Sequence, residues 1–292
     1  MLRLWTGLLL LAAVAAPDVP LEWKWKENDQ FWVEYASEYD DRNTIGGGDQ
    51  KAHETVRGVF QLTVQKAEAD RSAILGVKVH KFVFSNLQAK PLTEKLEGSA
   101  FEVTLDPQLA ITRIAGLEKV VQSLPGSEGM DKNQLKFLQT ILESMNRYWL
   151  TELLIAMPNK ATKPGDPWEQ KSTLNIEPLG QLMMHRSLKD GGPVQDGGRE
   201  LRKITMDVKF ECTPFKGEDK LLPFKVEKME MKRSECTTEA TFDPVAGRLV
   251  RSASKQKYAM HLKLDIGGTI REGDNEREQT HEVRVLDRSP LK

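Results

Sequence analysis

The segment Tyr258-Ala259-Met260-His261-Leu262-Lys263-Leu264-Asp265-Ile266, closed by Gly267-Gly268, decides the fold of this chain. Its larger apolar side chains occupy every second position, the pattern of a β-strand with one buried and one solvated face. Residues 31–35, 56–64 and 75–83 show the same alternation. Strands of this kind are typical of antiparallel sheets, so the sequence predicts a mainly antiparallel β-protein.

Two short segments, 103–107 and 240–244, resemble each other and indicate two hairpins. Both end in Asp-Pro and are followed by a second apolar segment that ends in arginine. Proline fixes φ, and an Asp side chain can accept hydrogen bonds from the backbone that follows it, so each Asp-Pro opens a turn. A duplicated half and a common hairpin used twice both explain the likeness.

A helical insert at about residues 115–157 separates the two β-rich parts. A short helix is expected from Leu117 to Leu124. Asp131 followed by Gln134 predicts a capping box at the start of a longer helix, and Pro158 ends its pattern. Apolar side chains then recur every three or four residues, either to cover a sheet or to line a pocket for an apolar ligand. The candidate ligand contacts are Leu135, Leu138, Leu142, Met145, Trp149 and Leu153.

These features predict an α+β fold, mainly antiparallel β, in which one strongly curved sheet or half-barrel is packed by the central helical insert. No proline-rich or serine-rich linker divides the chain, so residues 17–292 are expected to form a single β-rich domain. The architecture is similar to that of periplasmic lipoprotein carriers, but fold alone does not define function.

The sequence Lys163-Pro164-Gly165-Asp166-Pro167-Trp168 stands directly after the insert. Pro164-Gly165 suits a type II turn, and Trp168 starts a new strand. With the Asp-Pro hairpins and the N-terminal segment, this motif resembles an uncharacterised family of secreted bacterial β-rich proteins, over roughly residues 21–286. Pro167 departs from the small polar residue expected there. The resemblance implies the fold and carries no activity with it.

Residues 1–16 read as a secretory signal peptide, with Arg3 before an apolar core and a small-x-small site ahead of cleavage near Ala15-Ala16. The protein is therefore expected in the periplasm or outside the cell. The apolar run is too short to cross a bilayer, so no membrane span is predicted. With 42 basic and 43 acidic side chains, the chain has no basic excess to bind nucleic acid.

Only two cysteines occur, Cys212 and Cys236, and an oxidising compartment makes them disulfide candidates. The alternative is two buried thiols. The five histidines lack the spacing of a metal site, and no serine stands in a nucleophile motif. No catalytic residue, metal or cofactor is predicted, and an enzyme is not expected.

The sequence favours an exported, non-catalytic binding protein for a lipid-like or other apolar ligand of the cell envelope. This hypothesis rests on the broad apolar face of the segment from Leu135 to Met157. The alternative is a structural or protein-interaction module that binds another envelope protein. A large exposed apolar patch or a long unpaired strand edge would favour that alternative.

Overall fold

The structure, a computed structural model, describes residues 20–86, 90–176, 180–214 and 224–291, so the predicted signal peptide lies outside the described residues. The strands are β1 (Pro20–Leu21), β2 (Gln30–Asn43), β3 (Gln50–Ala67), β4 (Ala73–Phe84), β5 (Ala100–Leu105), β6 (Ile111–Ala115), β7 (Lys160–Ala161), β8 (Pro167–Ile176), β9 (Gly180–Asp196), β10 (Arg199–Pro214), β11 (Lys225–Asp243), β12 (Arg248–Ile266) and β13 (Thr269–Leu286). The helices are α1 (Lys90–Leu96), α2 (Leu117–Gln122) and α3 (Lys132–Leu153), with short 3-10 turns at Ile45–Gly47 and Ser127–Gly129.

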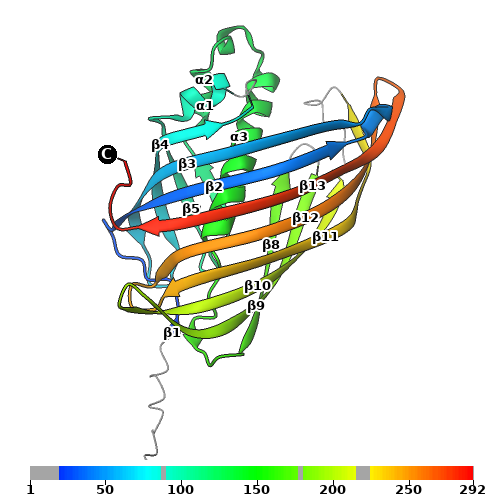
Figure 1. Ribbon diagram of the computed structural model, residues 1–292. Helices are drawn as coiled ribbons and strands as arrows, with labels where there is room; N and C mark the ends of the chain where they lie inside the picture. The colour runs from blue at the N-terminus through cyan, green and yellow to red at the C-terminus, as the bar shows by residue number, and fades with distance from the viewer. Residues whose placement is uncertain (1–19, 87–89, 177–179, 215–223, 292) are drawn as a thin grey trace, which may run out of the picture.

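Eleven strands form one antiparallel sheet in the order β6-β5-β4-β3-β2-β13-β12-β11-β10-β9-β8 (Figure 1). The first and last long strands, β2 and β13, pair at its middle and so join the N-terminal and C-terminal parts of the chain. Of the described residues, 62% lie in strands and 15% in helices, which confirms the predicted predominance of antiparallel β-structure. The sheet is open, with β6 and β8 as its edges.

The helical segment connects the two edges of the sheet. It leaves the edge strand β6, runs through α2 and α3, and returns to the sheet at the other edge strand, β8. On this path α3 contacts β6, β8 and the internal strand β12. In Figure 1 α3 lies behind the central strands, against one face of the sheet. That face is the inner one, and the apolar side chains of the strands point toward it.

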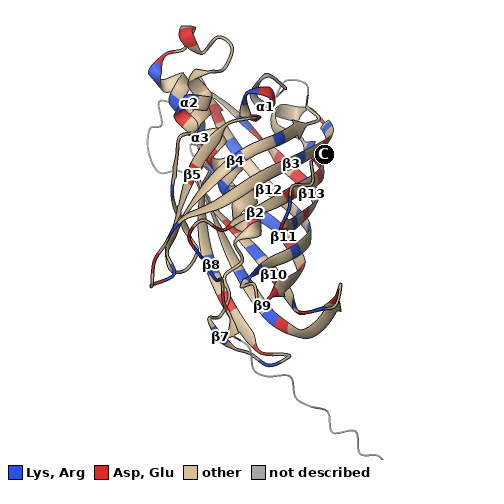
Figure 2. Cartoon of the chain, turned by 90° about the vertical axis from the view of Figure 1, so that its left-hand side faces the viewer, with Lys and Arg blue, Asp and Glu red and all other residues tan. Residues whose placement is uncertain are grey.

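Alternation places the core on the inner face. In β2, Phe31, Val33 and Tyr35 are buried, while the residues between them are partly exposed. Lysine, arginine, aspartate and glutamate are interspersed along the strands (Figure 2). Many of the charged side chains form cross-strand ion pairs such as Lys257–Glu278, with 2.7 Å between nitrogen and oxygen. Exposed pairs of this kind contribute at most about 1 kcal/mol each, so burial of the inner face dominates the stability of the sheet.

Both Asp-Pro segments form the hairpins that the sequence predicts. Asp106 connects β5 to β6, and its carboxylate accepts hydrogen bonds from the backbone nitrogens of Gln108 and Ala110. Asp243 connects β11 to β12, and its carboxylate accepts hydrogen bonds from the backbone nitrogens of Val245 and Ala246. The local chemistry of the two turns is therefore alike, which leaves open whether a duplication produced it.

The predicted capping box is present at the start of α3. The Asp131 carboxylate accepts from the backbone nitrogens of Asn133 and Gln134, and the Gln134 side chain accepts from the Asp131 nitrogen at 3.0 Å. Together these bonds satisfy three backbone donors at this helix end, which intrahelical bonds cannot reach. The short helix α2 also falls where the sequence predicts one.

Two tryptophan side chains donate hydrogen bonds to the backbone just after α3. The helix ends at Leu153, although the apolar spacing continues to Met157. The carbonyl oxygen of Ile155 accepts from Trp23 Nε1 at 2.8 Å, and that of Ala156 accepts from Trp168 Nε1 at 3.0 Å. These carbonyls are thus bound by side chains from distant segments, and the backbone leaves the helical path.

Candidate functional site

A cavity of about 400 Å³ lies between α3 and the inner face of the sheet. Most of its walls are aromatic or aliphatic, including Phe60, Phe82, Phe210 and Trp149. Six polar residues complete the lining: Ser37, Ser144, Asn146, Gln256, Arg277 and Gln279. A cavity of this size with a few polar groups is typical of small-molecule binding sites.

Half of the six predicted ligand contacts line this cavity. These six residues of the helix, here called the stripe, are Leu135, Leu138, Leu142, Met145, Trp149 and Leu153. Leu142, Met145 and Trp149 contribute to its wall. The remaining three stripe residues have packing roles instead: Leu153 is buried in the core, while Leu135 and Leu138 are half-buried against its edge. The stripe therefore serves both interpretations of the sequence, one part lining the cavity and the other covering the sheet.

Aromatic stacking builds one wall of the cavity. The rings of Phe60 on β3 and Trp149 on α3 lie parallel, with centroids 4.2 Å apart and an interplanar angle of 14°. Trp149 Nε1 donates to Asn146 Oδ1 at 3.0 Å, and Asn146 Nδ2 donates to the Leu142 carbonyl at 2.8 Å. The polar atoms of Asn146 and Trp149 are thus bonded within α3, and the stacked rings add apolar surface to this wall.

Cross-strand pairing brings polar residues together on the opposite wall and directly behind it. On the inner face, Ser37, His281 and Ser254 are register neighbours across β2, β13 and β12. Two positions further along, Gln279 stands beside Gln256. Although these strands are far apart in the sequence, their register forms one polar patch within an otherwise apolar interior.

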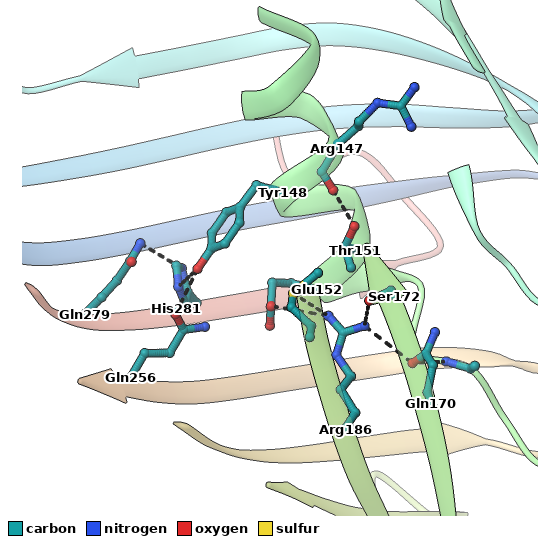
Figure 3. A network of polar contacts seen from close by, with 12 residues as sticks. Arg147, Tyr148, Thr151, Glu152, Gln170, Ser172, Arg186, Gln256, Gln279 and His281 are labelled. Atoms are coloured by element: carbon teal, nitrogen blue, oxygen red, sulfur yellow. Dashed lines mark hydrogen bonds and ion pairs between the residues drawn. The ribbon is translucent and has the colours of Figure 1, made fainter. Parts of the chain in front are cut away.

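The polar patch is connected to α3 through Tyr148 (Figure 3). The Tyr148 hydroxyl lies 2.9 Å from Gln256 Oε1 and 2.9 Å from His281 Nε2. On the other side of the imidazole, His281 Nδ1 lies 3.1 Å from the Tyr35 hydroxyl. Gln279 Nε2 donates to Ser37 Oγ at 2.9 Å. A continuous set of hydrogen bonds therefore links the helix to three strands.

Burial keeps this network uncharged. Desolvation, with a smaller contribution from the nearby Arg277 charge, lowers the pKa of His281 to about 3. Desolvation also raises the pKa of Tyr35 and Tyr148 above the ordinary value for tyrosine. At neutral pH the imidazole and both phenols are consequently neutral, and each acts as a hydrogen-bond donor and acceptor.

Arg277 is the charged residue of the cavity lining, and it is paired. Its Nε and one terminal nitrogen each lie 2.6 Å from a carboxylate oxygen of Asp41, a bidentate contact. The guanidinium carbon lies 4.3 Å from the centroid of the Tyr39 ring. Tyr39 in turn donates to Glu54. This end of the cavity therefore presents a neutralised ion pair against aromatic rings.

A second buried pair, Glu152 and Arg186, stands beside the network (Figure 3). An Arg186 terminal nitrogen lies 3.8 Å from a Glu152 oxygen, and Arg186 is only 1% exposed. Another terminal nitrogen is within 3.4 Å of Gln170 and Ser172. Burial raises the pKa of Glu152, and the Arg186 charge partly opposes this. Neither residue lines the cavity, so the pair belongs to the core beside it.

The disulfide interpretation is wrong for this structure. Cys212 and Cys236 are both free thiols, the first half-buried and the second buried. Cys236 on β11 pairs with Val208 on β10, four residues before Cys212. Four residues along a strand span about 13 Å, well beyond the roughly 7 Å between Cα atoms that a disulfide can bridge. The alternative, two buried thiols, holds for Cys236 but not for the half-buried Cys212.

The Lys163-to-Trp168 motif has a structural role. Asp166 N donates to the Lys163 carbonyl at 2.9 Å, and Gly165 has φ of +99°, which confirms the predicted type II turn. Gly165 N and the Asp166 carbonyl both bond to the backbone of Asp190 on β9. The motif thus fixes the start of β8 against β9 and lies outside the cavity lining.

The described residues contain neither a metal-ligand cluster nor a membrane-spanning helix. No group of three or more histidine, cysteine, aspartate and glutamate side chains there has the arrangement needed to hold a metal ion. Within the same residues, no helix has both the length and the apolar character required to cross a bilayer.

No protein-family model matches the sequence, and neither does any curated protein. Among solved structures, a lipovitellin structure concerned with lipid–protein interactions is similar, with 12% identity and a TM-score of 0.47 over 92% of this chain and 26% of that one. OccAB4 of Acinetobacter baumannii has 6% identity and a TM-score of 0.20 over 89% and 99% of the two chains. An outer membrane channel from Pseudomonas putida F1 has 8% identity and a TM-score of 0.23 over 91% and 98%.

This chain therefore spans about a quarter of the length of the lipovitellin chain that it matches. With TM-scores below 0.5, none of these likenesses bears on what the protein binds or does.

Proposed function

We propose that this protein is an exported, non-catalytic binding protein whose cavity holds a lipid-like or other apolar ligand in the cell envelope. The observation that carries the proposal is the cavity of about 400 Å³ between α3 and the sheet, with walls that are mostly aromatic and aliphatic. Its volume lies within the range of known ligand pockets. Transfer of apolar ligand surface from water to such walls is favourable by about 25 cal/mol per Å².

The proposal includes a half-barrel shape for the sheet around α3. Neighbouring strands are about 4.8 Å apart, so the edges of a flat sheet of eleven strands would be separated by roughly 48 Å. A helix has a diameter of about 10–12 Å with its side chains. Because α3 contacts both edge strands and β12, curvature of the sheet around the helix explains its contacts better than a flat sheet does. The curvature would enclose the ligand on several sides.

The place of action belongs to the same proposal. Cleavage near Ala15-Ala16 would release the chain into the periplasm or the extracellular space, as expected of the secreted bacterial family that the Lys163-to-Trp168 motif resembles. A lipid-like ligand is poorly soluble in water, so a carrier with an internal apolar cavity suits transport or storage in such a compartment.

The alternative, a protein-interaction module, has less support. The exposed large apolar side chains of the described residues are Val83, Val245, Ile266, Ile270 and Leu291. Of these, only Ile266 and Ile270 share one hairpin. Of the two edge strands, β6 is only five residues long, and the ten-residue β8 is contacted by α3.

Native mass spectrometry with lipid extraction, on protein purified from the envelope fraction of its own host, tests the proposal. We expect an apolar molecule to be retained by the wild type. Met145→Trp should abolish retention, because the larger side chain fills the cavity that Met145 lines. Leu135→Trp is the matched control, since Leu135 belongs to the same helix stripe but lies outside the cavity lining.

Two results would contradict the proposal. One is a wild-type protein that carries no apolar molecule. The other is equal retention by the wild type and Met145→Trp, which would place the bound molecule elsewhere. An empty protein that instead retains envelope proteins would favour the interaction module.

A further inference from the structure

One residue of the cavity lining carries a buried amide nitrogen without a partner. Gln256 on β12 lines the cavity and is only 2% exposed. Its Oε1 accepts from the Tyr148 hydroxyl, but Nε2 has no hydrogen-bond partner in the described part of the chain. A buried donor left unpaired costs about 1–3 kcal/mol, so such a group is uncommon in a protein core without a reason.

The surrounding network cannot satisfy this amide. Tyr148 contacts both Gln256 and His281 Nε2, so the phenol donates its one proton in one direction and accepts in the other. If the Gln256 amide is turned over, Nε2 donates to the Tyr148 oxygen and Oε1 becomes the atom without a partner. In both orientations one polar atom of Gln256 is left without a partner in the described part of the chain.

The charge state of the walls limits what a molecule in the cavity can be. Arg277 is the charged residue of the lining, and both of its contacting nitrogens are bound to Asp41. The imidazole behind the wall is neutral, because burial lowers the pKa of His281 to about 3. A carboxylate or phosphate would therefore be buried without a free cation among the lining residues, and an ammonium group without a free carboxylate. Burial of an unpaired charge is strongly unfavourable.

From these observations we infer that the cavity takes an uncharged amphiphile, a long-chain molecule with one hydroxyl or carbonyl oxygen that bonds to the Gln256 amide while its hydrocarbon lies along Phe60 and Trp149. The inference rests on the proposed function and adds the chemistry of the head group. A hydroxyl suits both amide orientations, because it donates and accepts. A carbonyl oxygen suits the orientation in which Nε2 faces the cavity.

The test uses four probes with the same twelve-carbon chain: 1-dodecanol, 1-chlorododecane, dodecanoate and dodecylammonium. Their dissociation constants are measured by displacement of the neutral fluorophore N-phenyl-1-naphthylamine from the purified protein. On the wild type, we expect dodecanol to bind more tightly than both ions. An ion that binds as tightly as the alcohol, or more tightly, would overturn the inference. This comparison needs no variant.

The second arm measures the Gln256 contact itself. In Gln256→Met, the ratio of the dodecanol constant to the chlorododecane constant should rise by about threefold to tenfold, because one hydrogen bond is lost. The ratio cancels any change in affinity that is equal for the two probes. In the control Ser254→Ala the ratio should stay constant, since Ser254 is a buried, unpartnered residue of the same strand that does not line this cavity. A change below threefold in Gln256→Met would refute the contact.

The outcomes separate the two proposals. If the fluorophore shows no saturable binding to the wild type, and the protein from its host is empty, the proposed function fails. If the fluorophore and the alcohol bind but the ratio is the same in Gln256→Met, the apolar cavity stands and the head-group inference fails.

Discussion

Replacing His281 with glutamine should make the folded protein less sensitive to mild acid. An unfolded histidine titrates near pH 6.5, whereas folded His281 stays neutral down to a pKa of about 3 because burial disfavours its charge. Between these two values the unfolded state binds one more proton than the folded state. The free energy of unfolding therefore falls as the pH falls through this window.

The size of the effect follows from the width of the window. Each pH unit below the unfolded pKa is worth about 1.4 kcal/mol, so His281 alone removes about 2 kcal/mol of stability between neutral pH and about pH 5. Glutamine cannot titrate, and its amide can still donate to Tyr148 and accept from Tyr35, the two contacts of the imidazole. The variant should therefore lack this loss while it keeps the network connected.

Urea unfolding followed by tryptophan fluorescence, at about pH 7 and at about pH 5, measures the difference. Glu152, whose raised pKa acts in the opposite direction, is common to wild type and variant and cancels in the comparison. His53→Gln is the control, because exposed His53 has a pKa raised by its hydrogen bond to Asp40, and its removal should not reduce acid sensitivity. If His281→Gln loses as much stability in acid as the wild type does, the imidazole is charged in the folded protein and the reasoning is wrong.

Three further predictions concern a buried ion pair, the two thiols and the cap of α3. Arg186→Met should cost about 3–5 kcal/mol in urea unfolding because it leaves Glu152 buried without its partner, and adding Glu152→Gln should restore much of the loss. Cys212 and Cys236 should both react with Ellman's reagent in the unfolded, unreduced protein; in the folded protein Cys236 should be protected, since burial raises its pKa to about 12. Asp131→Ala should lower the free energy of unfolding by about 1 kcal/mol, because the cap of α3 is lost.

Local rules predicted much of the fold. Alternation located the long strands, Asp106 and Asp243 marked two hairpins, and Asp131 marked the start of α3, because in each case neighbouring residues decide the structure. Non-local contacts explain what was missed. Gly191-Gly192 has the composition of a turn, but pairing with β10 keeps it inside β9, at the register shift opposite Lys203 and Ile204.

The candidate site was predicted only in part. The apolar wall on α3 was visible because helical spacing placed Leu142, Met145 and Trp149 on one side. The polar wall was not visible, because the register of three strands brings its residues together from sequence positions more than two hundred residues apart. A polar residue at an inward strand position, as at His281, was the available signal. It becomes informative only when the burial of that position is known.

The inner face of β12 links the stability of the fold to its proposed use. From Met260 to Leu264 its inward residues are apolar, but Ser254 and Gln256 are polar and buried. Folding alone would favour apolar side chains there, since an unpaired amide costs about 1–3 kcal/mol. In Gln256→Met the Tyr148 phenol loses its Gln256 acceptor but can turn its proton to His281 Nε2. The free energy of unfolding should therefore stay unchanged or rise, while binding of the alcohol probe weakens. Such opposite effects are expected where a binding group is kept at the expense of stability. If Gln256→Met instead destabilises the protein, the amide stabilises the fold through its own hydrogen bonds, and the argument that it is kept for a ligand fails.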